Sequence, residues 1–135
     1  MKSTHAAAAV LVILSFAGWA LPAAADGDVA AGKNLFNQCR ACHQIGPDAQ
    51  NSVGPVLNGV VGRKAGTYPG YNYSDANKNS GLTWDEATLK EYLKDPRAKV
   101  PGTKMVFPGI KQDDRIANII AFLATIKANG DGADE

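Results

Sequence analysis

Apolar residues recur at helical spacing in three stretches of the chain. In the last of these, apolar side chains follow one another at intervals of three and four residues, at Ile116, Ile119, Ile120 and Leu123. This spacing predicts a helix over residues 113–128 with one buried face.

The first stretch predicts a helix over residues 28–42. Asp28 is a good N-cap residue, and Gly32, Phe36 and Cys39 fall on one stripe of the helix. A glycine inside a helix costs up to about 1 kcal/mol relative to alanine. Close approach of a second helix would explain that cost, and the apolar face of the 113–128 helix is the expected partner.

The third helix is predicted over residues 83–95. Thr83 and Glu86 form a capping-box pattern, with Thr83 as the N-cap residue. Pro96 ends the helix, because the residue before a proline avoids the helical conformation. Its buried stripe is expected to consist of Leu89, Tyr92 and Leu93.

Residues 44–82 show no sustained helical or strand period and are rich in glycine and proline. Such a long irregular stretch is unusual in a compact domain, unless the chain wraps a large rigid ligand that supplies the missing core. Ser74 is expected to cap a short helical turn at 74–77. The predicted fold is therefore all-α, with long loops around a bound group.

The N-terminal stretch has a basic start at Lys2, an apolar centre over residues 6–21 and small residues up to Ala25. This order is typical of a secretory signal peptide, and we expect cleavage after Ala25. A single domain would then cover residues 26–135. An uncleaved membrane anchor is the alternative, although the apolar run is shorter than the roughly 20 residues a membrane helix needs.

Removal of residues 1–25 would leave the side-chain charges balanced, because Lys2 accounts for the net charge of +1. A neutral chain gives no support for nucleic acid as a partner. The acidic C-terminal residues Asp131, Asp134 and Glu135 are expected to be solvated and frayed.

The segment Cys39-Arg40-Ala41-Cys42-His43 carries the chemistry. Two cysteines three apart, followed directly by histidine, indicate covalent attachment of one haem c. On a helix the two thiols and the imidazole would share one face, and His43 would ligate the iron. A disulfide, a redox-active dithiol and half of a zinc site are the alternatives. Zinc needs four ligands, and the remaining histidine, His5, lies in the predicted leader.

Met105 is the candidate for the second axial position of the iron. It is the one methionine beyond the predicted leader, and it follows the Pro101-Gly102 loop instead of lying on a periodic apolar face. His/Met ligation raises the reduction potential and leaves no open iron site, which favours electron transfer over catalysis. We therefore do not expect an enzyme. Core packing by Met105, other ligands or an open sixth site remain alternatives.

In several motifs the sequence resembles the class I c-type cytochromes, a family that includes mitochondrial cytochrome c. The resemblance covers about residues 28–127. The motifs fall in the order Cys39–His43, Gly54-Pro55-Val56-Leu57, Gly62-Arg63-Lys64, Tyr71–Asn77, Trp84, Tyr92-Leu93 and Pro101–Met105 followed by Phe107.

This resemblance implies roles for individual residues. The first and last helices would cross at Gly32 and Phe36 against Ile119 and Phe122, and Pro55 would accept a hydrogen bond from His43. Residues near the haem propionates would be Tyr73, Trp84 and Arg63. A polar network on the Met105 side would consist of Asn77, Tyr92 and Thr103.

The resemblance also implies a function: a soluble, monomeric single-haem electron carrier. The alternative is a haem enzyme or gas sensor with a displaceable sixth ligand. The leader favours a bacterial periplasmic protein. Its donor would be a cytochrome bc complex or a dehydrogenase, and its acceptor an oxidase, a photosynthetic reaction centre or a reductase.

Basic residues around an exposed porphyrin edge would steer an acidic partner and make the encounter salt-sensitive. The candidates are Lys33, Lys64, Arg97, Lys99, Lys104 and Lys111. Gln38 and Ala98 stand where mitochondrial relatives carry lysines, which weakens this ring. The resemblance also implies that a nearby loop lysine replaces the methionine ligand at alkaline pH. Because Ala98 cannot act as a ligand, we expect Lys104 to replace Met105, with Lys99 as the second candidate.

Overall fold

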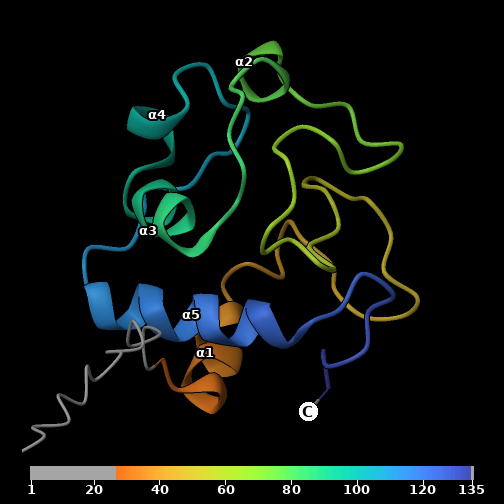
Figure 1. Ribbon diagram of the computed structural model, residues 1–135, viewed down its shortest axis with the longest axis vertical. Helices are drawn as coiled ribbons and strands as arrows, with labels where there is room; N and C mark the ends of the chain where they lie inside the picture. Colours follow the sequence, from red (N-terminus) through yellow and green to blue (C-terminus); the bar gives the residue numbers. More distant parts are fainter. Residues whose placement is uncertain (1–26, 135) are drawn as a thin grey trace, which may run out of the picture.

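The computed structural model describes residues 27–134, so the predicted leader 1–25 lies outside the described residues. Within 27–134 the regular structure is helical, and the single β-bridge joins Lys64 to Thr83. The expected all-α fold is confirmed. The helices are α1 (Val29–Phe36), α2 (Asp75–Lys78), α3 (Glu86–Lys94), α4 (Pro96–Lys99) and α5 (Asp113–Thr125) (Figure 1).

Helices α1 and α5 cross at the base of the fold, as expected (Figure 1). A Cβ atom added to Gly32 would lie 1.9 Å from the backbone oxygen of Asn118. The rings of Phe36 and Phe122 pack beside this contact with their centroids 5.5 Å apart. Gly32 is thus the point of closest approach, where no side chain fits.

Helix α1 ends at Phe36, before the Cys39–His43 motif, and not at residue 42 as predicted. The backbone continues in tight turns, in which Cys39 donates to Phe36 and Cys42 donates to Cys39. These bonds span three residues and wind the chain more tightly than an α-helix. The cysteines therefore lie on a turn that follows the helix.

Helix α3 is capped by Asp85, which accepts a hydrogen bond from the Thr88 amide at 2.7 Å. The predicted Thr83 cap is wrong, because Thr83 is held in the bridge to Lys64. The α3 stripe of Leu89, Tyr92 and Leu93 is buried, as predicted.

Two short helices flank the loops. Ser74 caps α2 through a bond from the Asn77 amide, which confirms the predicted turn. Asp95 ends α3 and caps α4 by accepting from Ala98. The sequence prediction placed no helix after Pro96, although proline suits the first position of one.

The C-terminal residues fold back against the domain. Helix α5 ends at Thr125, short of the predicted residue 128, and Ala133 is only 3% exposed. A Cβ atom on Gly130 would lie 2.1 Å from the backbone of Gly46, and Lys33 donates to the backbone oxygen of Asp134. Asp131 and Asp134 are solvent-exposed as expected, but the expectation that this tail is frayed is wrong for these two residues; Glu135 is outside the described residues.

Apart from α2, residues 44–82 form loops that close the side of the molecule opposite α3 and α4 (Figure 1). No helix within residues 27–134 has the length and apolar character that crossing a membrane requires.

Candidate haem site

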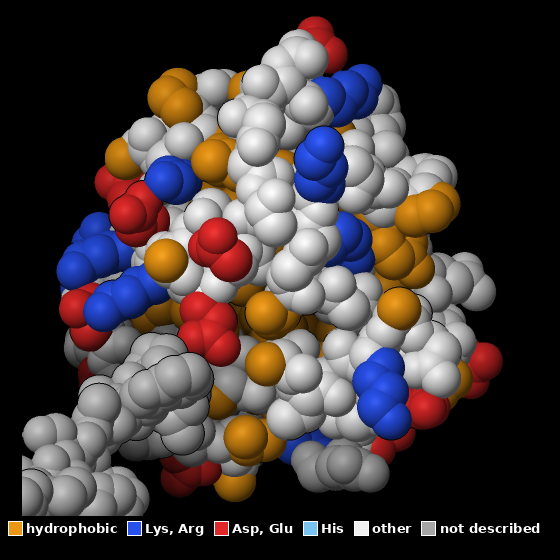
Figure 2. Space-filling model, viewed as in Figure 1, with side chains coloured by type: hydrophobic (Ala, Val, Ile, Leu, Met, Phe, Trp, Pro, Cys, Tyr) orange, Lys and Arg blue, Asp and Glu red, His pale blue; other side chains and the backbone are white. Residues whose placement is uncertain are grey.

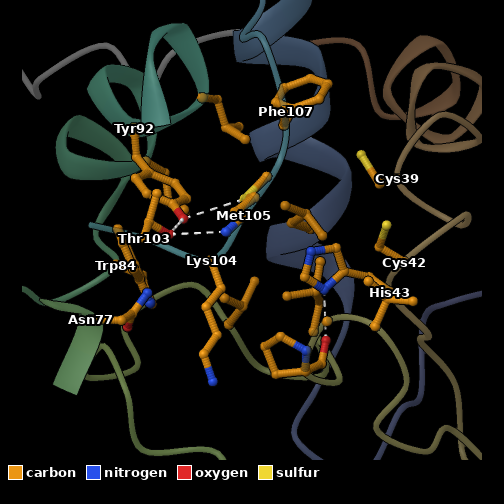
Figure 3. A pocket seen from close by; sticks show the side chains of 18 of the residues that line it. Cys39, Cys42, His43, Asn77, Trp84, Tyr92, Thr103, Lys104, Met105 and Phe107 are labelled. Carbon is orange, nitrogen blue, oxygen red and sulfur yellow. Dashed lines mark hydrogen bonds between the residues drawn. The ribbon is translucent and has the colours of Figure 1, made fainter. Parts of the chain in front are cut away.

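One cavity of about 330 Å³ lies between α3, α5 and the loops. Every site residue predicted from the sequence lines it, and Figure 3 labels several of them. These residues are Cys39, Cys42, His43, Pro55, Arg63, Tyr73, Asn77, Trp84, Tyr92, Thr103 and Met105. The lining is otherwise largely apolar, with no Asp or Glu among the described residues that form it.

His43 is held in one orientation. Its Nδ1 lies 2.7 Å from the Pro55 carbonyl oxygen, an acceptor, so this nitrogen carries the proton. Burial, the largest effect, lowers the pKa of His43, with the charge of Arg63 acting in the same direction and the bond to Pro55 opposing them. A neutral ring with Nδ1 protonated keeps its Nε2 lone pair for a metal.

Gly54 lies directly against this ring. A Cβ atom at Gly54 would lie 2.4 Å from Cε1 of His43. The glycine therefore lets the backbone pack against the imidazole, and the ring has little room to turn.

Cys39 and Cys42 are free thiols on the same side of the cavity as His43 (Figure 3). Burial, and secondarily the neighbouring Cys42, raises the pKa of Cys39 to about 11. Redox-active dithiols have lowered thiol pKa values, so this environment does not favour that alternative. Among residues 27–134 no group of three or more His, Cys, Asp or Glu side chains is placed to bind a metal ion, which counts against zinc.

Met105 lies on the opposite side of the cavity, in a small polar network (Figure 3). The Tyr92 hydroxyl donates to Met105 Sδ at 3.3 Å and also lies 3.3 Å from Thr103 Oγ1. Thr103 Oγ1 in turn accepts from the Met105 amide. Burial raises the pKa of Tyr92, so its hydroxyl stays a donor. These hydrogen bonds thus orient the Met105 thioether.

A partly buried cation lies elsewhere in the lining. The Arg63 guanidinium donates to the carbonyl oxygens of Asn58 and Val56, and it stacks 4.9 Å from the ring centroid of Tyr68. Its Nε is buried without a hydrogen-bond partner among the described residues. With no carboxylate in the lining, the site suits a ligand that brings its own anionic groups.

Three further residues line the cavity together with Arg63. The Tyr73 hydroxyl accepts from the Tyr68 amide, which leaves its proton for another acceptor. Trp84 packs on Tyr92 with 4.7 Å between ring centroids. The side-chain oxygen of Asn77 is buried without a partner among residues 27–134.

The structure adds positioning residues that the sequence analysis missed. The Asn58 amide bonds both backbone groups of Gly46, and the Tyr71 hydroxyl donates to the Val53 carbonyl oxygen at 2.6 Å. Both side chains connect loops on the His43 side. The only sequence signal for Asn58 was a polar residue at the end of an apolar run.

A covalently bound haem fits all of these features of the cavity. The cavity combines two thiols, a neutral imidazole with a directed lone pair, a thioether and a buried cation in an apolar lining. The site and the helical fold define a small protein that encloses one covalently bound haem, the class of the c-type cytochromes.

The comparisons with known proteins give the family. The cytochrome c family profile matches residues 29–127, so the chain belongs to the cytochrome c family, as a class I c-type cytochrome. Cytochrome c2 of Rhodomicrobium vannielii is 62% identical over 107 residues, which cover 79% of this chain and 86% of that protein. Cytochrome c-550 of Bradyrhizobium diazoefficiens is 62% identical over 101 residues, covering 75% and 74% respectively.

A solved structure agrees with this assignment. Cytochrome cH from Methylobacterium extorquens superposes with a TM-score of 0.70 at 57% identity, covering 73% of this chain and 99% of that one. The chain is therefore a single-haem electron carrier that works with other redox proteins, with haem c attached through Cys39 and Cys42.

Proposed function

We propose that His43 Nε2 and Met105 Sδ are the two axial ligands of the haem iron. The observation that carries this proposal is their placement on opposite sides of one cavity, each oriented by a hydrogen bond, from His43 to Pro55 and from Tyr92 to Met105 (Figure 3). When bound, the haem supplies a one-electron couple.

The remaining site residues orient and shield that group. Tyr73, Trp84 and Arg63 would hold the propionates; the buried Arg63 Nε, which has no partner among the described residues, supports an anionic group there. Asn77, Tyr92 and Thr103 fix the Met105 side. Because His43 is bonded to the Pro55 carbonyl and the Met105 amide to Thr103 Oγ1, these segments would hold the haem in one position, and the haem would supply the one-electron chemistry.

The experiment is spectroscopy of the haem-loaded protein produced with its maturation machinery. We expect a low-spin iron, a proton NMR signal of an iron-bound methionine methyl group in the reduced state, and loss of that signal in Met105→Leu. Rapid stoichiometric binding of carbon monoxide by the reduced protein at neutral pH would instead support a haem enzyme or gas sensor.

We further propose that residues 1–25 are a cleaved signal peptide and that residues 26–135 act in the bacterial periplasm as a soluble monomer. The sequence pattern at Lys2 and residues 6–25 supports export. The donor would be a cytochrome bc complex or a dehydrogenase, and the acceptor an oxidase, a reaction centre or a reductase. Mass spectrometry tests the cleavage: an N-terminus at Met1 would indicate a retained anchor.

A further inference from the structure

The residues after α5 fold back against the loop that follows His43. We call residues 127–134 the C-terminal strap. Its turn is closed by two backbone hydrogen bonds of 2.9 Å, from the Lys127 amide to the Asp131 carbonyl oxygen and from the Gly130 amide to the Lys127 carbonyl oxygen. Figure 1 shows the strap beside the loops that follow α1. The strap residues themselves do not line the haem cavity.

The strap and the loop meet backbone to backbone. A Cβ atom on Gly130 would lie 2.1 Å from the carbonyl carbon of Gly46 and 2.5 Å from the Pro47 nitrogen, so no side chain fits between the two segments. Gly130 has a φ of 90°, a conformation that glycine adopts readily and other residues rarely. Ala133 is only 3% exposed, and a Cβ atom on Gly46 would lie 4.0 Å from its Cβ. The glycine at position 130 thus permits close packing on the His43 loop.

Two further contacts fix the ends of the strap. Lys33 Nζ, from α1, donates to the Asp134 backbone oxygen at 2.7 Å. Lys33 was expected near the haem edge, but it does not line the haem cavity. At the other end of the strap, a Cβ atom on Gly59 would lie 3.0 Å from Ala128 Cα. The strap is therefore held by three separate parts of the chain.

The segment that bears Pro55 holds the same loop as well. Its backbone amides donate to the carbonyl oxygens of Cys42 and Gln44, at 2.8 and 3.1 Å. The Asn58 side chain bonds both backbone groups of Gly46. The loop on which the strap packs is thus the loop that is joined to the hydrogen-bond acceptor of His43.

A surface cleft of about 410 Å³ connects the strap to His43 more directly. His43 lines this cleft in addition to the haem cavity, and Asp134 of the strap also belongs to the cleft wall. The cleft is the side from which water can approach the imidazole ring. Displacement of the strap would widen it and admit water beside the His43–Pro55 hydrogen bond.

Charge does not explain the position of the strap. Asp134 shares the cleft with Arg40 and Asp48, so the cleft wall carries both signs of charge. On the face shown in Figure 2, lysine and arginine side chains lie among acidic ones and form no patch of one sign. The strap is therefore held mainly by close backbone packing.

We propose that the C-terminal strap is a positioning element for His43. By packing on Gly46 it keeps the loop after His43 in place, and so keeps the Nδ1 proton of His43 on the Pro55 carbonyl oxygen. This inference rests on the proposed function, in which His43 Nε2 binds the iron. A histidine ligand is oriented by the hydrogen bond that its other ring nitrogen makes, so the strap acts on the iron site through the loop.

Exchange of the His43 Nδ1 proton with solvent tests this role. The proton is followed by NMR in the haem-loaded, reduced protein after transfer to deuterated water. Gly130→Ala, which forces the strap away from Gly46, should raise the exchange rate by at least about tenfold, because exchange requires local opening of the hydrogen bond. A chain that ends at residue 127 should show a similar rise, and it introduces no new clash.

Gly109→Ala is the matched control. Gly109 has a φ of 89°, and a Cβ atom there would lie 2.2 Å from the Lys94 backbone oxygen, so the strain and the clash resemble those at Gly130. Gly109 packs on the end of α3, away from the strap. Gly109→Ala should lower the overall stability but leave the His43 exchange rate within about threefold of the parent rate, because the local opening at His43 does not involve α3.

The strap and the ligand assignment fail on different measurements. Absence of the methionine methyl signal in the parent protein would overturn the ligand assignment. In a parent protein that shows this signal, an unchanged His43 exchange rate in both strap variants would overturn the strap proposal alone. An equal rise in Gly109→Ala would also overturn it, because exchange would then follow global unfolding.

Discussion

The side chain of Asn58 holds both backbone groups of Gly46. Its Oδ1 accepts from the Gly46 amide at 2.9 Å, and its Nδ2 donates to the Gly46 carbonyl oxygen at 2.8 Å. Asn58 is 6% exposed, so water cannot readily replace these bonds. The loop that follows His43 is thereby fixed to the segment that carries Pro55, the hydrogen-bond partner of His43.

Asn58→Ala should therefore destabilise the protein. It leaves a buried amide and a buried carbonyl of Gly46 unpaired, at a cost of about 1–3 kcal/mol. Denaturant unfolding of the haem-loaded protein measures this loss. Asn34→Ala on the exposed side of α1 is the control, and a change in Asn58→Ala no larger than in that control would contradict the prediction.

Gly32→Ala should lower the free energy of unfolding despite the better helix propensity of alanine. The gain in propensity is at most about 1 kcal/mol. The new Cβ would meet the Asn118 backbone oxygen at 1.9 Å, and because a helix carbonyl cannot rotate away, α1 and α5 must separate. We expect a net loss of about 1–3 kcal/mol in denaturant unfolding. A higher free energy of unfolding in Gly32→Ala would contradict this prediction, because it would show that α1 and α5 can separate without loss of stability.

Tyr92→Phe should lower the midpoint potential. Its hydroxyl withdraws electron density from Met105 Sδ, and without that bond the thioether donates better to ferric iron. A hydrogen bond of about 1 kcal/mol corresponds to a fall of up to about 40 mV in redox titration. Tyr71→Phe, whose hydroxyl bonds Val53 instead, is the control. A rise in potential would count against Met105 as the ligand.

Lys104→Ala should change the alkaline behaviour of the ferric protein. Lys104 lines the cavity next to Met105, held by Asn72, whereas Lys99 is paired with Glu91. We expect the lysine-ligated alkaline form to disappear or to need higher pH in Lys104→Ala and to persist in Lys99→Ala. A pH titration followed by NMR decides this, and an unchanged lysine-ligated species in Lys104→Ala would refute it.

Asp113→Asn should lower the free energy of unfolding at neutral pH and change it little in acid. The hydrogen bond from Lys94 lowers the pKa of Asp113 most, and the hydrogen bond from Lys90 lowers it further. A lowered folded-state pKa gives stability that is present above the unfolded value, about 3.9, and is lost as pH falls through the folded value. Denaturant unfolding at both pH values measures the difference, with Asp114→Asn as the control for the helix dipole. A difference that does not shrink in acid would contradict the assignment.

Side-chain chemistry was easier to predict from the sequence than local backbone geometry. The Cys39–His43 spacing and the isolated Met105 sufficed to predict a haem site, because few other chemistries use that pattern. The Thr83 cap failed because Asp85 offers an equally good capping side chain, and the bridge to Lys64 decides between them. The Asn58 contact joins separate loops, and no local pattern encodes it.

The C-terminal segment has a practical consequence. Because Gly130 packs on the backbone of Gly46 and Ala133 is buried, the last residues belong to the wall behind the His43 loop. An affinity tag, a fusion partner or an electrode linker joined at the C-terminus would therefore begin close to that wall. Shortening the chain to residue 127 would remove this part of the wall.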